Sequence, residues 1–216
     1  LILLSAGCAK KSDDKRNGNG LHVTEKKEIA QKSYEYYKFT PDTAKISIPD
    51  FSEDKAFRVG ENYVLAGYYE SVDGSPSLHD KEGDSGRRLL FIDRNKEILF
   101  RSSGAGDLYS YEPTFFKNDI NGKIIMICQM SYEYFCGGDA FLIEDNKIKY
   151  IGNIDIEPVS FDRRLVDVIK IETVESKTIF RLNSDSVDLS PGTDDILLKN
   201  ENIRYEYDGK NLRLIR

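Results

Sequence analysis

Residues 123–156, KIIMICQMSYEYFCGGDAFLIEDNKIKYIGNIDI, decide the fold class of this chain. Three apolar runs are separated by two groups of residues that favour turns, one around Tyr132 and one at Asp145-Asn146. Short apolar runs with such tight connections indicate antiparallel strands that are joined by hairpins. The stretch therefore predicts three successive strands, each paired with the next along the chain.

The rest of the chain repeats this pattern. Further hairpins are expected around residues 93–96 and at Asp208-Gly209, where turn-forming residues again separate apolar runs. We expect about ten to twelve short strands with local connections, which is typical of antiparallel all-β architecture. The predicted fold is therefore mainly β: an antiparallel meander or sandwich, or a partly open barrel.

One short N-terminal helix is predicted within residues 24–39, TEKKEIAQKSYEYYKF. Thr24 can cap this helix, and Pro41 would end it because proline cannot continue a helix. Four side chains of the segment fall near one face at helical spacing: Ile29, Ser33, Tyr36 and Tyr37.

The composition favours a folded, acidic protein. The 216 residues include 13 Tyr and 11 Phe, which supply enough large apolar surface for a core. The formal net charge is −6, whereas proteins that bind nucleic acid need a basic face for the phosphates. Nucleic acid is therefore not an expected partner.

The first eight residues, LILLSAGC, combine an apolar run, three small residues and Cys8. An apolar run that ends at small residues is typical of the end of a secretory signal. The segment LLSAGC resembles the lipobox of bacterial lipoproteins, although Ser5 stands where that family has Leu. The resemblance implies that residues 1–7 are a signal remnant that is removed. It also implies that Cys8 carries diacylglycerol, with a further acyl chain such as palmitate on the new N-terminus.

The segment that follows Cys8 is polar. Residues 9–20, AKKSDDKRNGNG, contain no apolar side chain larger than Ala, so we expect residues 8–23 to be the lipidated cysteine and a flexible tether. Residues 24–216 are predicted to form a single mainly-β domain. Its hairpins, such as FLIEDNKIKYIG and YDGKNLRLI, resemble small β-rich lipoproteins of Gram-negative bacteria. This resemblance implies a place in the cell envelope, with a lipid anchor in the outer membrane on its periplasmic or surface face.

Two cysteines remain in the predicted domain, Cys128 and Cys136. They are symmetric about Tyr132, so a hairpin that turns there would let them face each other at bridging distance. Because the envelope is an oxidising compartment, we predict a disulfide between them. Two reduced cysteines that pack as small apolar side chains are the alternative.

The aromatic group of Tyr132, Tyr134 and Phe135 is the best candidate for a binding surface. Tyrosine combines a rigid apolar ring with a hydroxyl group and is frequent at interfaces. Packing across strands is the alternative for these side chains. The favoured function is a binding or interaction module in the envelope, with an envelope protein or a glycan as partner. A hydrolase that uses paired carboxylates and a structural envelope component are the alternatives.

Two motifs contain residue types that could support catalysis or metal binding. GDSG at residues 83–86 resembles the nucleophile segment of trypsin-like serine proteases, but Arg87 stands where that family has glycine, and His79 is too near in sequence. Several aspartates share the loop at residues 183–195 without the spacing of a calcium-binding loop: Asp185, Asp188, Asp194 and Asp195. We therefore predict no catalytic residue, no metal and no cofactor. Whether the protein is an enzyme stays open, although the scarcity of candidate catalytic residues argues against an enzyme.

Overall fold

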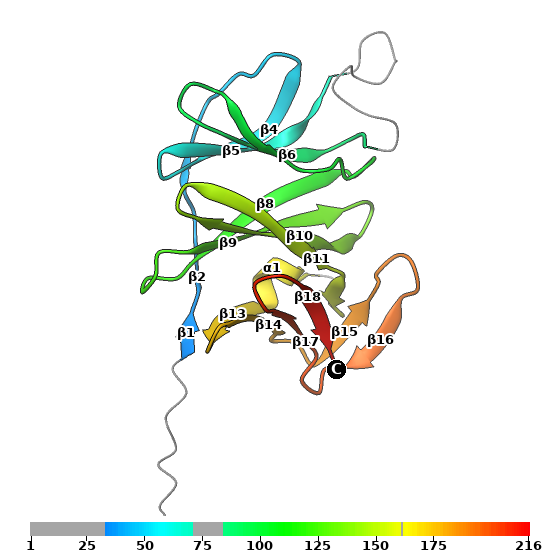
Figure 1. The fold of residues 1–216 in the computed structure, drawn as a ribbon. Helices are drawn as coiled ribbons and strands as arrows, with labels where there is room; N and C mark the ends of the chain where they lie inside the picture. The colour runs from blue at the N-terminus through cyan, green and yellow to red at the C-terminus, as the bar shows by residue number, and fades with distance from the viewer. Residues whose placement is uncertain (1–32, 71–83, 161) are drawn as a thin grey trace, which may run out of the picture. The chain divides into compact units, whose positions relative to one another are not determined.

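The structure of the protein is a computed structural model that describes residues 33–70, 84–160 and 162–216. These residues form antiparallel strands in four sheets, as Figure 1 shows, so the predicted mainly-β fold is confirmed. Gln31–Arg216 make up one compact unit, and the predicted domain start at residue 24 lies outside the described residues, as do Cys8 and the predicted tether.

Three of the four sheets are five-stranded, and two of these three are built mainly from strands that are consecutive in the chain. The first, called the meander sheet, has the strand order β3 (Asp42–Thr43), β4 (Phe51–Val59), β5 (Asn62–Tyr69), β6 (Arg88–Ile92) and β7 (Ile98–Arg101). The second, called the central sheet, has the order β11 (Lys147–Ile154), β10 (Phe135–Glu144), β9 (Ile124–Ser131), β8 (Ser110–Lys117) and β2 (Tyr37–Phe39). Strands β9, β10 and β11 are the three that residues 123–156 predict.

The other two sheets contain the last third of the chain. The C-terminal sheet has the order β1 (Ser33–Glu35), β13 (Ile169–Val174), β14 (Lys177–Leu182), β17 (Arg204–Tyr207) and β18 (Leu212–Ile215). The small sheet consists of β12 (Ile156–Pro158), β15 (Ser186–Leu189) and β16 (Ile196–Lys199). A single helical turn, α1 (Leu165–Val168), follows β12. In the described part of the chain, no helix has the length and apolar character needed to cross a membrane.

The central sheet is buried on both faces. Ile125 and Ile127 of β9 belong to an apolar cluster shared with the C-terminal and small sheets. Met126 and Cys128, which alternate with them, belong to a cluster shared with the meander sheet. Side chains of a strand point alternately to opposite faces, so a strand between two cores needs a continuous apolar run. This requirement explains the sequence IIMIC.

The predicted N-terminal helix is wrong where the structure describes it. Residues 33–39 form β1 and β2 instead of a helix. Glu35 pairs with Glu172 of β13, and Tyr37 pairs with Lys117 of β8. Pairing with strands far along the chain therefore outweighs the weak helical spacing of this tyrosine-rich segment, because tyrosine fits a sheet well. The rest of the predicted helix lies outside the described residues.

The described part of the GDSG motif has a structural role. The Asp84 carboxylate lies 3.0 Å from Arg101 Nη2 and 3.6 Å from the buried Arg88 Nη1. Gly86 has φ +92°, and a Cβ there would lie only 1.9 Å from the carbonyl oxygen of Gly106. The motif thus holds two chain segments together and needs glycine for their close approach.

Candidate binding site

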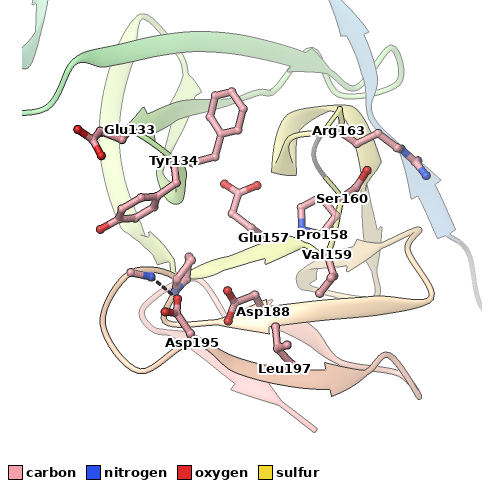
Figure 2. A pocket seen from close by; sticks show the side chains of 13 residues that line it. Glu133, Tyr134, Glu157, Pro158, Val159, Ser160, Arg163, Asp188, Asp195 and Leu197 are labelled. Carbon is pink, nitrogen blue, oxygen red and sulfur yellow. Dashed lines mark hydrogen bonds between the residues drawn. The ribbon is translucent and has the colours of Figure 1, made fainter.

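A cavity of about 560 Å³ lies between the β9–β10 turn and the small sheet. Figure 2 shows its lining, in which Glu157 of β12 stands among side chains from the turn, from β15 and from the chain after β12. The lining combines apolar and aromatic side chains with carboxyl groups. We call it the small-sheet cavity.

One row of side chains crosses the small sheet into this cavity. Glu157 lies opposite Asp188 in the β12–β15 pair, and Asp188 lies opposite Leu197 in the β15–β16 pair. Residues directly opposite each other in antiparallel strands project from the same face. Glu157 is 5% exposed, Asp188 is half-buried, and Leu197 is 64% exposed. The row therefore runs from the floor of the cavity to its rim.

The Glu157 carboxylate accepts three hydrogen bonds from N–H groups. The backbone N–H of Gly137 donates to Oε1 at 2.8 Å, and that of Leu165 donates to Oε2 at 2.7 Å. The side-chain amide of Gln129 also donates to Oε1. Burial nevertheless raises the pKa of Glu157 to about 7, against the opposing effects of these donors and of Arg164. This group changes charge near neutral pH.

Gln129 completes this buried network. Its Nε2 also donates to the carbonyl oxygen of Gly137 at 2.9 Å, and its Oε1 accepts from the N–H of Val166 at 3.3 Å. The first N–H groups of a helix have no partner within the helix. Glu157 and Gln129 therefore satisfy the first two N–H groups of α1 and connect them to β9, β10 and β12.

Two further carboxyl groups, those of Asp188 and Asp195, line the cavity together with Glu157. Burial, the nearby charges of Asp195 and Asp155, and a hydrogen bond with the Asp195 side chain raise the pKa of Asp188. Asp188 Oδ1 is buried and has no hydrogen-bond partner among the described atoms. Asp195 Oδ1 accepts the N–H of Gly192 at 2.6 Å (Figure 2). Asp188 thus has unused acceptor capacity at the cavity.

The aromatic residues singled out from the sequence lie at the rim. Tyr134 and Phe135 line the cavity, whereas Tyr132 does not line it and packs against Tyr134 with ring centroids 6.1 Å apart. Each of the three is more than one third exposed. Tyr134 lies so close to Gly192 that a Cβ at position 192 would be 2.1 Å from its hydroxyl oxygen. Glycine there leaves room for the ring.

Sequence reasoning missed Glu157, and it considered Asp188 and Asp195 only as calcium ligands. The signal for Glu157 was present as a single acidic residue within the apolar run IDIEPV. A charge at such a position is buried and needs partners. The described residues contain no group of three or more His, Cys, Asp or Glu side chains placed to hold a metal ion.

The predicted disulfide is not formed, and both cysteines are free thiols. The strand register places Asp139 opposite Cys128, because Phe135 pairs with Ser131 across a turn centred on Glu133 and a bulge between Phe135 and Gly138 shifts the pairing by one further residue. Gly137, with φ +80°, lies in this bulge. Burial raises the pKa of Cys128 well above its usual value and that of Cys136 to about 11. Neither sulfur is therefore a thiolate at neutral pH.

No family model, no curated protein and no solved structure matches this chain. A proposal about function therefore starts from the geometry and charge of the small-sheet cavity.

Proposed function

We propose that this protein is a lipid-anchored binding module of the cell envelope, whose ligand carries a positive charge on an apolar body. The charge and the apolar lining of the small-sheet cavity are the main support for this proposal. Four carboxyl groups line it, from Glu133, Glu157, Asp188 and Asp195, against one cation, Arg163. Binding sites typically combine an apolar lining with a few polar groups that orient the ligand.

Charge and shape both favour a cationic ligand. An ammonium or guanidinium group can donate to Asp188, whose Oδ1 has no partner among the described atoms. The rings of Tyr134 and Phe135 can contact the apolar body of such a ligand, and the Tyr134 ring can attract its charge, whereas the Phe135 ring already has the Arg164 guanidinium 5.9 Å from its centroid. Of the partner classes expected from the sequence, a basic segment of an envelope protein and an amino-bearing glycan both have this chemistry.

A carboxylate hydrolase is the second candidate. The cross-strand pair Glu157 and Asp188 favours it, because both carboxyl groups line a cavity and both have a raised pKa. However, Glu157 is 5% exposed and both of its oxygens accept N–H donors from the protein, so the carboxyl group is poorly placed to exchange a proton with a substrate. We therefore place binding first. Cleavage of a chromogenic aryl glycoside that is lost in Glu157→Gln would reverse this order.

The binding proposal predicts discrimination by charge. Benzylamine, benzyl alcohol and benzoate share one ring and differ in charge, and only benzylamine should shift the NMR signals of the small sheet. Asp188→Asn should weaken benzylamine binding by about ten- to hundredfold, because a charged hydrogen bond is worth about 1.5–3 kcal/mol. Asp185→Asn is the matched control, since Asp185 is exposed and does not line the cavity. Equal binding of all three probes, or equal loss in both variants, would contradict the proposal.

The lipid anchor is supported by the lipobox-like segment LLSAGC. Cys8→Ser, expressed behind a complete lipoprotein signal in a Gram-negative host, should move the protein from the washed membrane fraction to the soluble fraction. Cys136→Ser removes another thiol and should leave the protein in the membrane fraction. Immunoblots of both fractions measure the effect. Membrane retention of the Cys8→Ser protein after a high-salt wash would show that lipid on Cys8 is not the anchor.

A further inference from the structure

Strand β16 forms an open edge of the small sheet. It pairs with β15 and stands at the end of the strand order, with no further strand beside it in the described part of the chain (Figure 1). Three of its four residues are apolar, and Ile196 and Leu197 are 39% and 64% exposed. Proteins usually protect edge strands with charges or proline, because an open edge can pair with another chain. Here the only charge within β16 is Lys199 at its end, so residues 196–198 present an uncharged edge.

The register identifies the backbone groups that face outward. The N–H of Asn200 donates to the carbonyl oxygen of Asp185 at 2.9 Å, one position beyond the β15–β16 pairs. Bonded and non-bonded pairs alternate along an antiparallel ladder, so Ile196 and Leu198 bond to β15. Leu197 and Lys199 therefore direct their N–H groups away from β15. The carbonyl oxygen of Lys199 accepts the N–H of Glu201, which leaves that of Leu197 for a partner.

We infer that β16 pairs with an extended basic peptide segment of a partner protein, which adds a fourth strand to the small sheet. This inference rests on the proposed function, because a side chain of the added strand would supply the cation for the cavity. The residue opposite Leu197 continues the row of Glu157, Asp188 and Leu197 on the same face. Main-chain hydrogen bonds would give affinity, and the cavity would select the side chain.

The geometry selects a long basic side chain. The added residue would lie two strand spacings, about 10 Å, from Asp188. Arginine and lysine are long enough to cross Leu197, and their apolar stems can pack on this exposed side chain while the charged end reaches the carboxylates. Shorter side chains would stop above Leu197.

Charge complementarity excludes a second copy of this chain as the preferred occupant. Pairing of β16 with β16 of another copy would bring two acidic cavities, each with four carboxyl groups, to one seam. The chain also carries a formal net charge of −6. Like charges brought together in this way oppose association, whereas a basic segment relieves the repulsion.

The test uses the peptide acetyl-Thr-Val-Arg-Val-Thr-Val-amide and two analogues of it. One analogue has N-methyl groups at the positions that would bond to β16, and the other has norleucine in place of Arg. Both should bind at least several-fold more weakly than the parent in calorimetric titrations, since each lost hydrogen bond costs about 0.5–1.5 kcal/mol. Hydrogen exchange at Leu197 and Lys199 should slow only when the parent peptide is bound.

Lys199→Pro provides a second, independent measurement. It removes one outward N–H without touching the ladder to β15, and proline is tolerated at such edge positions. Lys199→Pro should bind the parent peptide about two- to tenfold more weakly. Lys199→Ala, which loses only the side chain, should bind it normally, and benzylamine should bind both variants as it binds the wild-type protein.

The outcomes separate the two proposals. If benzylamine binds but the parent and N-methyl peptides bind equally, the cavity takes a cation and the added strand is wrong. If neither benzylamine nor the parent peptide binds, the proposed function fails as well. A concentration-dependent dimer in sedimentation that disappears in Lys199→Pro would replace the peptide by a second copy of this chain.

Discussion

Glu157→Ala should lower the free energy of unfolding by about 3–5 kcal/mol, because it leaves buried N–H groups without an acceptor. The N–H groups of Gly137 and Leu165 would each lose the only hydrogen-bond acceptor shown for them. Gln129 would keep its bond to the carbonyl oxygen of Gly137 and would lose the carboxylate. Urea unfolding followed by circular dichroism measures the change.

Glu133→Ala is the control for this loss. Glu133 also lines the cavity but is exposed, so its removal should change the free energy of unfolding by no more than about 0.5 kcal/mol. If Glu157→Ala were as stable as Glu133→Ala, the hydrogen bonds of Glu157 would not hold the small sheet to the central sheet, and the cavity floor would need another explanation.

The strand pattern was predictable because the hairpins are local. Asp145 and Asn146 both have positive φ, 50° and 57°, as the tight turn between β10 and β11 requires. Gly209, with φ +92°, lies in the turn between β17 and β18. In each hairpin the sequence itself contains the turn residues and the apolar runs that pair across them, so local information suffices.

The cavity was not predictable from the same information. Glu157 meets Asp188 only because β12 pairs with β15, across a segment that contains α1, β13 and β14. A two-residue period tells which side chains share a face of one strand, but it does not identify the partner strand. The turn between β9 and β10 had a similar effect at short range. It is centred on Glu133 instead of Tyr132, and the bulge at Gly137 adds one more residue, so Cys128 and Cys136 do not face each other.

The largest effect of pH should also come from Glu157. In the unfolded chain its carboxyl group has a pKa near 4.5, whereas burial raises the pKa to about 7 in the folded protein. Between these values the folded protein holds a proton that the unfolded chain has lost, so stability falls as pH rises. This difference in pKa corresponds to a loss of about 3 kcal/mol in the free energy of unfolding over this pH range. Asp188, whose pKa is also raised, contributes with the same sign.

Urea unfolding of the wild-type protein and of Glu157→Gln between pH 4.5 and 8 measures this contribution, because effects common to both proteins cancel in the difference. The free energy of unfolding of the wild-type protein minus that of Glu157→Gln should be largest near pH 4.5 and should fall by about 3 kcal/mol towards pH 8. Benzylamine binding should change in the opposite sense, since loss of the Glu157 proton adds a negative charge to the cavity. A difference between the two proteins that is constant with pH would mean that Glu157 is ionised throughout and that its N–H donors outweigh its burial.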